Sequence, residues 1–386
     1  MRHTALSDSS KHHHHILQVI DLYDILTASL LHFQMSFSKP LPGGRKSYSV
    51  PKQELRANRC FTTLNIKRAV NEPACDNALE KLRYDLARKF SKTNVRVPVS
   101  TENKISGNWI ALAMPDAIPS RLGLMTRIAS LVAMCGGSDD GLAPKNASCD
   151  KFSLPFTSDL AEALPATLDH HQPSERRRNG SAHRTKYRTI FEDQIKPVFN
   201  DLLSADRSMG LEVLTAWYHH CRESSTTTTP TVENPLDFES PPHDSLRISP
   251  GNPWVSTLRY ALGLHLEDAE LELIEPAVAA AMQSVTLTRD YWAWPRDSCS
   301  ADNAKRLKNA VAVSMVERQC SEAQAVLVVK NAAIAAERRF LDRKRDLVEA
   351  MGEQHSEVVM FLDAVEHFAA GNSLWCSSCP LYHRRR

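Results

Sequence analysis

The chain has 386 residues, of which 42% are apolar and 24% are charged, so it is long enough for one large globular domain or two ordinary ones. Its formal net charge of +2 excludes a general affinity for nucleic acid or for a membrane surface. No apolar segment is long and uninterrupted enough to span a bilayer, so we expect a cytoplasmic protein without a membrane span.

The N-terminal part is expected to be a disordered extension, residues 1–47, in front of one domain at 48–386. The segment "MSFSKPLPGG" begins with Met35 and reads like a natural start. Residues 1–34 are therefore interpreted as an extension or a gene-model error.

Two helices are predicted in the first part of this domain. Apolar residues recur at helical spacing in 76–90, and Asp76 is placed to act as the N-cap. The second helix, 119–135, is apolar over most of its surface and is therefore expected to be buried. Glycines and acids in "GGSDDGLAPKNAS" (136–148) end it.

The rest of the chain is also predicted to be helical. The segments with helical pattern are 189–203, 254–263, 267–296, 301–318, 322–350 and 355–370. The Pro- and Thr-rich stretch 224–242 is expected to be a flexible loop. Ser321 precedes Gln324 by the spacing of a capping box. Since no stretch shows convincing strand alternation and no period repeats, the sequence predicts an all-α domain.

The segment "TRDYWAWPRD" (288–297) is unusual because it combines aromatic and charged residues. A helix that presents oxygen ligands four residues apart can hold Mg²⁺. Those positions are Arg289, Ala293 and Asp297, and only the last is an oxygen ligand, while the neighbouring Asp290 points about 100° away. On spacing alone, a buried helix whose aromatic residues line a core is the favoured interpretation.

Three other patterns have a chemical interpretation beside a structural one. Asp139 and Asp140 follow a buried helix and are suited to bind Mg²⁺ and, through it, a diphosphate, although a plain loop is favoured. Arg247 precedes a Ser-Pro-Gly break and has the planar fork that binds phosphate, although most such arginines are merely solvated. The lone C-x-x-C of Cys376 and Cys379 lacks the partners of a zinc site, and nine irregularly spaced cysteines do not form a disulfide framework.

Taken in order along the chain, several segments resemble the cyclase domain of fungal class I terpene synthases of the fusicoccadiene-synthase type. The matching segments are "SYSVPKQELRANRCFTTLNIKR" (47–68), "GNWIALAMPDAIPSRLGLMTRIASL" (107–131), the run from "STLRYALGL" to "DYWAWPRD" (256–297), "NAVAVSMVERQCSEAQAVLVVK" (309–330) and "GNSLWCSSCPLYHRRR" (371–386). The resemblance thus covers about 48–386.

The resemblance implies a class I terpenoid synthase fold, an antiparallel helix bundle around an apolar pocket. It implies a cyclase that uses Mg²⁺ to ionise a linear prenyl diphosphate, with geranylgeranyl diphosphate favoured, and forms a polycyclic terpene hydrocarbon. Because no prenyltransferase domain follows, a separate prenyltransferase is expected to supply the substrate. A homo-oligomer is left open.

The resemblance also implies roles for particular residues. The metal positions would be Asp139, Asp140, Asp290 and Asp297. Arg247 and Tyr382 would be catalytic diphosphate contacts, with Gly251 and Arg296 also at the substrate. Tyr291, Trp292 and Trp294 are candidates for the pocket wall, because a ring face attracts positive charge.

The sequence departs from the family at its second metal motif, N-D-x-x-S-x-x-K/R-E. Set on this chain the motif falls at Arg289, Asp290, Ala293, Arg296 and Asp297, so arginine and alanine stand at two ligand positions. An arginine beside a metal site repels the cation, although it could replace the cation's charge against a diphosphate.

The first metal motif and the closing segment are also altered. The motif D-D-x-x-D/E falls on "GGSDD" and keeps only Asp140, or, with an insertion, on Asp139 and Asp140 followed by Ala143. The closing arginine-tyrosine pair is Leu381 and Tyr382. The alternative to a cyclase is therefore a catalytically impaired protein of the same fold that only binds a prenyl ligand or a partner, and a third reading is a helical scaffold without a pocket.

Overall fold

The computed structural model describes residues 47–90, 102–103, 105–135, 195–226, 253–299, 309–351 and 356–383. These residues belong to one compact unit, Lys46–Arg386. The predicted extension therefore lies almost wholly outside the described residues, as does 227–242 of the predicted loop, whose first three residues are helical. Both stay predictions.

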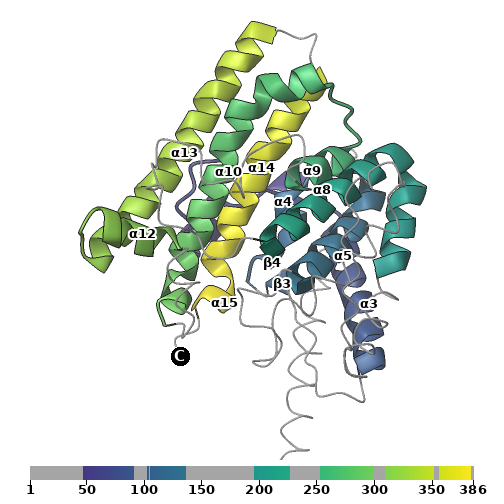
Figure 1. The fold of residues 1–386 in the computed structure, drawn as a ribbon, viewed down its shortest axis with the longest axis horizontal. Coiled ribbons are helices and arrows are strands. Elements are labelled where there is room, and N and C mark those ends of the chain that lie inside the picture. Colours follow the sequence, from purple (N-terminus) through teal and green to yellow (C-terminus); the bar gives the residue numbers. More distant parts are fainter. Residues whose placement is uncertain are drawn as a thin grey trace, which may run out of the picture. The chain divides into compact units, whose positions relative to one another are not determined.

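Helices make up most of the described part of the chain, which confirms the all-α prediction (Figure 1). They are α2 (Lys52–Ala57), α3 (Glu72–Phe90), α4 (Trp109–Ala113), α5 (Pro119–Cys135), helical residues 195–205, α8 (Arg207–Thr226), α9 (Pro253–Leu262), α10 (Asp268–Asp297), α12 (Ala310–Glu317), α13 (Glu322–Met351), α14 (Ser356–Ser378) and α15 (Pro380–His383). For the helices that were predicted, most bounds fall within two residues of the sequence-based ones, while 301–308 lie outside the described residues. The sequence pattern did not predict α2, α4, α8 and α15.

Two short antiparallel strand pairs are present that the sequence pattern did not indicate. Strand β1 (Ser47–Ser49) pairs antiparallel with β2 (Lys67–Ala69), and β3 (Glu102–Asn103) pairs with β4 (Gly107–Asn108). Strands of two or three residues are too short to show a period of two, so alternation cannot reveal them. They fasten loops to the helices and do not alter the fold class.

Two helix ends differ from expectation. Helix α3 begins at Glu72, one turn earlier, so Asp76 is not its N-cap, and the Asp76 carboxylate instead accepts a 3.4 Å hydrogen bond from the Asn108 side chain. Pro73 follows Glu72 in the first turn, where a missing N–H costs nothing. Helix α14 continues past residue 370 to Ser378, because Gly371 is packed against α4 and does not end the helix.

The capping box at the start of α13 is confirmed. The backbone N–H of Ser321 donates to Gln324 Oε1 at 2.9 Å, and the N–H of Gln324 donates back to Ser321 Oγ at 3.4 Å. These bonds satisfy two donors that a helix start otherwise leaves without partners.

Helix α10 packs against both α13 and α14, and in Figure 1 it lies between them. Helix α14 also contacts α4 and α9, while α3 packs on α5 and α8 on α9. The main core fills the space among these helices, and a smaller cluster joins the end of α10 to α12 and α13. Among the described helices, none is long and apolar enough to cross a membrane.

One buried acid attaches the segment before β2 to α13. Glu337 is fully buried and accepts hydrogen bonds from Thr62 Oγ1 at 2.6 Å, the Thr63 N–H at 2.8 Å and Thr63 Oγ1 at 2.9 Å. Burial raises the pKa of Glu337 above its usual value of 4.5, and the three hydrogen bonds only partly oppose this.

The raised pKa of Glu337 predicts a specific pH dependence of stability. Between pH 4.5 and the higher native pKa, the folded state binds a proton that the unfolded state has lost, so the free energy of unfolding falls as the pH rises. The fall is at most about 1.4 kcal/mol per pH unit within that window. In Glu337→Gln this contribution is absent, and urea unfolding from pH 4 to 8 should show a flatter profile. Glu349→Gln, an exposed acid of the same helix, is the control; a profile equally steep in Glu337→Gln would refute the assignment.

Candidate active site at the end of helix α10

Two acids near the end of α10 are tied to the start of α12. Asp290 is 7% exposed, and its Oδ2 accepts a 3.0 Å hydrogen bond from the N–H of Ala310. Asp297 Oδ2 accepts a 3.1 Å bond from Asn309 Nδ2, and the same amide donates to the backbone oxygen of Asp290 at 3.0 Å. The two acids therefore lie on one side of α10, one helix turn on either side of Ala293, and both face Asn309.

Two arginines lie beside these acids. Arg296 Nε donates to Asp297 Oδ1 at 2.9 Å, and Arg289 Nε lies 3.8 Å from Asp290 Oδ1. The Arg296 guanidinium also lies 5.3 Å from the ring centre of Tyr382 on α15, a cation–π distance. Four of the residues that the sequence indicated, Asp290, Arg296, Asp297 and Tyr382, are thus brought together at the end of α10.

Of the aromatic residues of "TRDYWAWPRD", Trp292 packs against the main core, while Tyr291 and Trp294 belong to the smaller cluster. Trp292 stacks on Phe61 with ring centres 6.1 Å apart and meets His383 at 5.2 Å. Tyr291 meets the edge of Phe61 at 5.1 Å, and Trp294 donates its indole N–H to Glu322 at 2.9 Å within the smaller core cluster. These rings join α10 to the segment around Phe61 and to α13, and their role as a pocket wall stays a prediction.

A different set of aromatic rings lies inside the bundle. The Trp254 ring on α9 contacts Trp109 on α4 at 5.0 Å, Trp217 on α8 at 5.0 Å and Phe368 on α14 at 5.5 Å. Trp375 extends this cluster, with its ring 6.4 Å from Trp109. We call these five rings the interior aromatic cluster.

The interior aromatic cluster reaches the end of α10 through one residue. The Trp375 ring lies 6.1 Å from the ring of Tyr382, which is in turn below the Arg296 guanidinium. Among the described residues, the indole N–H groups of Trp109 and Trp375 have no hydrogen-bond partner. Buried donors of this kind are expected to meet a ligand or water.

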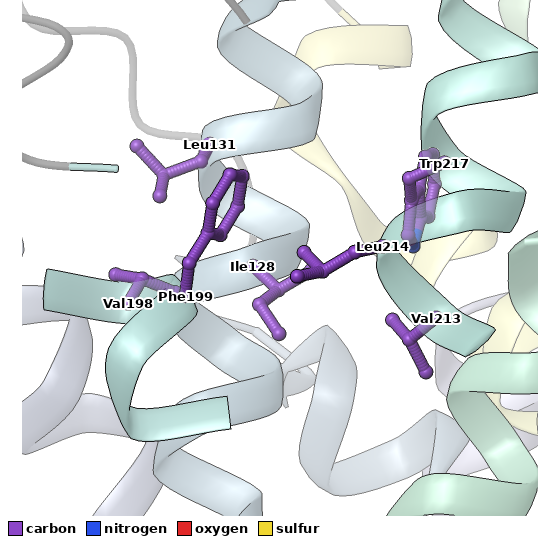
Figure 2. A pocket seen from close by; sticks show the side chains of 7 residues that line it. All are labelled: Ile128, Leu131, Val198, Phe199, Val213, Leu214 and Trp217. Atoms are coloured by element: carbon purple, nitrogen blue, oxygen red, sulfur yellow. The ribbon is translucent and has the colours of Figure 1, made fainter. Parts of the chain in front are cut away.

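At its other end the cluster meets a small apolar pocket. Figure 2 shows the pocket between α5, helical residues 195–205 and α8, and every lining side chain is apolar or aromatic: Ile128, Leu131, Val198, Phe199, Val213, Leu214 and Trp217. The pocket is small, with about 10 Å³ of free space, which is room for about one water molecule. Trp217 belongs to both the pocket and the cluster, so a chain of ring contacts leads from the pocket to Tyr382.

The described residues at the end of α10 do not by themselves fit Mg²⁺. This ion prefers several oxygen ligands in octahedral array, whereas here both carboxylates already bind an arginine, an amide or a backbone N–H. No group of three or more His, Cys, Asp or Glu side chains in the described ranges could bind a metal ion. Binding of Mg²⁺ by Asp290 and Asp297 is therefore not supported by their geometry.

Four predicted site residues lie outside the described residues, namely Asp139, Asp140, Arg247 and Gly251. Sequence reasoning missed Asn309 and the interior aromatic cluster. Asn309 directly precedes an apolar helical run and could have been identified as an N-cap. The cluster had no comparable signal, because its five rings come from four helices that are distant in the sequence.

Comparison with known proteins finds fungal terpene synthases. The chain is 26% identical over 341 residues to a bifunctional terpene synthase of Fusarium proliferatum, which covers 87% of the chain and 42% of that protein. It is 27% identical over 343 residues to preterpestacin I synthase of Cochliobolus heterostrophus, with 87% and 45% covered. A shorter match of 135 residues is 30% identical to fusicoccadiene synthase of Phomopsis amygdali and covers 34% of the chain and 18% of that protein. The chain therefore spans less than half of the length of these relatives.

Solved structures show the same fold. Aristolochene synthase from Penicillium roqueforti superposes with a TM-score of 0.51 and 15% identity, covering 78% of this chain and 95% of that one. The ancestral protein SVS_A2 gives a TM-score of 0.52 and 16% identity, covering 82% and 88%. No protein-family model matches the chain.

Proposed function

The chain is related to fungal terpene synthases and has the class I terpene synthase fold, and on this premise we propose that it is a terpene cyclase. The substrate would be a linear prenyl diphosphate, with geranylgeranyl diphosphate favoured, and the product a polycyclic terpene hydrocarbon. The observation that supports this most is the chain of aromatic ring contacts between the apolar pocket and Tyr382, which ends beside Arg296.

The chemistry of such a substrate matches this arrangement. A prenyl chain is hydrocarbon and would lie on the apolar surface, while its diphosphate would lie toward Arg296 and Tyr382. Breaking the carbon–oxygen bond leaves the electron pair on diphosphate and gives an allylic cation. Ring closure within the hydrocarbon and loss of a proton then yield the product. The faces of the interior rings would stabilise the cation during these steps, in a site that excludes water.

The diphosphate end of this proposal includes residues that the structure does not describe. As the family resemblance implies, Arg247 and Gly251 would contact the diphosphate, and Asp139 and Asp140 would bind Mg²⁺. Since the residues at the end of α10 do not fit Mg²⁺, we assign no step of the reaction to a metal ion bound there. A prenyltransferase, on a separate chain or elsewhere in a longer protein, would supply the substrate.

One observation favours a second function. Because Asp290 and Asp297 are already paired within the protein, the chain could retain a prenyl ligand without ionising it. In that case the protein would bind a prenyl ligand or a partner and would not release product.

A single assay distinguishes the two functions. The folded full chain is incubated with farnesyl, geranylgeranyl and geranylfarnesyl diphosphates and MgCl₂, and hydrocarbons are sought by gas chromatography–mass spectrometry. A cyclase gives a hydrocarbon from at least one substrate, and a sample without MgCl₂ reports the dependence on metal. If no substrate gives hydrocarbon, the cyclase proposal is wrong, and calorimetric titration with the same diphosphates then tests the binding function.

A further inference from the structure

We propose that Asp290 and Asp297 fasten helix α12 to the end of α10 and are not Mg²⁺ ligands in this chain. The two acids stand where the family resemblance predicts metal binding, but their contacts are those of structural residues. Turnover is not needed to test this, because the relevant measurements are metal affinity and the exchange of backbone amides in α12.

All four carboxylate oxygens have partners within the protein. Asp290 Oδ2 accepts from the Ala310 N–H at 3.0 Å, and its Oδ1 lies 3.8 Å from Arg289 Nε. Asp297 Oδ1 accepts from Arg296 Nε at 2.9 Å, and its Oδ2 accepts from Asn309 Nδ2 at 3.1 Å. Binding Mg²⁺ would require breaking several of these contacts and would place the ion beside two guanidinium groups.

The same contacts complete the start of α12. Asn309 is the N-cap, and its Oδ1 accepts from the N–H of Val311 at 2.9 Å while its amide group donates to α10. The N–H of Ala310, the first residue of α12, donates to the carboxylate of Asp290. A negative charge at a helix N-terminus is favourable, because the first N–H groups have no partner within the helix. Asp290 and Asn309 therefore supply acceptors to the first N–H groups of α12, and Asp297 accepts from the Asn309 side chain, which is the N-cap.

The helix face between the two acids offers no further ligand. Ala293 lies midway along that face, is 1% exposed and packs in the main core. An alanine has no oxygen to donate to a cation, and its burial leaves no room for a water ligand on the same side. The carboxylates of Asp290 and Asp297 thus have all their partners within the protein and do not need a metal ion.

The test compares the full chain with Asp297→Ala and Asn309→Ala, each with and without millimolar MgCl₂. Hydrogen–deuterium exchange of the amides at 310–313 should become roughly tenfold faster in both variants, since Asn309→Ala loses the N-cap and Asp297→Ala loses the part-buried hydrogen bond that holds the Asn309 side chain. Calorimetric titration with MgCl₂ alone should give the same result for Asp297→Ala as for the unaltered chain. Asp268→Ala, which removes an exposed acid from the opposite end of α10, is the matched control.

Asp290→Ala is a second variant, and Asp290→Asn keeps an acceptor oxygen at that position if the alanine variant does not fold. Tenfold weaker Mg²⁺ binding in Asp297→Ala, or in a folded Asp290 variant, would overturn the proposal. Exchange of 310–313 at the level of the Asp268→Ala control in both Asp297→Ala and Asn309→Ala would overturn it too. Faster exchange together with unchanged Mg²⁺ titration supports it.

Discussion

Gly371→Ala is expected to destabilise the protein by about 3 kcal/mol or more, enough to leave a marginally stable chain largely unfolded on mild heating. A Cβ added to Gly371 would overlap the carbonyl group of Leu112 and lie 2.8 Å from the backbone nitrogen of Ala113. These are backbone atoms of α4, so no side-chain rotation can relieve the overlap. Either α4 or α14 must move, and both are part of the main core.

The measurement is urea unfolding of the full chain, with the midpoint and slope compared between variants. Gly123→Ala is the matched control, since its added Cβ would lie 3.2 Å from the Ala74 carbonyl oxygen and 3.3 Å from Ala78 Cβ, so its neighbours need to move by only a few tenths of an ångström. Alanine also favours helix over glycine by about 1 kcal/mol, so the control should change stability little. Equal midpoints for the two variants would show that α4 and α14 are not as close as described.

Trp375→Leu is expected to lower turnover of the accepted prenyl diphosphate by roughly 30-fold, if the proposed cyclase activity holds. A desolvated ring facing a cation is worth about 2 kcal/mol, which corresponds to that factor in rate. Leucine keeps an apolar side chain of moderate size but has no ring face. Trp375→Phe keeps a ring and should retain most of the rate. The measurement is kcat for hydrocarbon formation, together with the product distribution.

Trp294→Leu is the matched control for the interior aromatic cluster. Its indole donates to Glu322 and its ring packs in the smaller core cluster, away from the main core. Its kcat should stay within about threefold of the unaltered enzyme. If Trp294→Leu lowers kcat as strongly as Trp375→Leu, the sequence-based assignment of Trp294 to the pocket wall is right and our choice of rings is wrong. Equal rates for the leucine and phenylalanine variants of Trp375 would also contradict the role of its ring.

Local sequence pattern was sufficient for most of the helices. Helix α5 was predicted at its observed bounds, and the capping box of Ser321 and Gln324 forms as its spacing indicates. These features depend on residues within one or two turns of each other, so a single segment contains the information. Helices α2, α4, α8 and α15 were not predicted, and the start of α3 and the end of α14, which were misplaced, depend on contacts with other segments.

The site was only partly predictable for the same reason. The family motif set on α10 indicated both Asp290 and Asp297, although spacing alone put Asp290 about 100° away from the expected ligand face, and the family order of segments pointed to Tyr382. Neither pattern indicates that Asn309 donates to the Asp297 carboxylate and to the backbone oxygen of Asp290, or that Arg296 lies over the Tyr382 ring. These pairings join segments from different parts of the chain, so only their packing decides them.

By itself the sequence determined the helical fold class, the buried faces of the predicted helices and the relationship to terpene cyclases. Helical periodicity and the order of motifs are properties of the linear sequence and do not depend on which segments pack together. Only the tertiary structure decided which aromatic rings meet inside the bundle and which partners the acids of α10 take. A carboxylate binds whatever donor lies within about 3 Å. Which donors lie there depends on how α10, α12, α14 and α15 pack, so the same two aspartates could be metal ligands in one protein and helix caps in another.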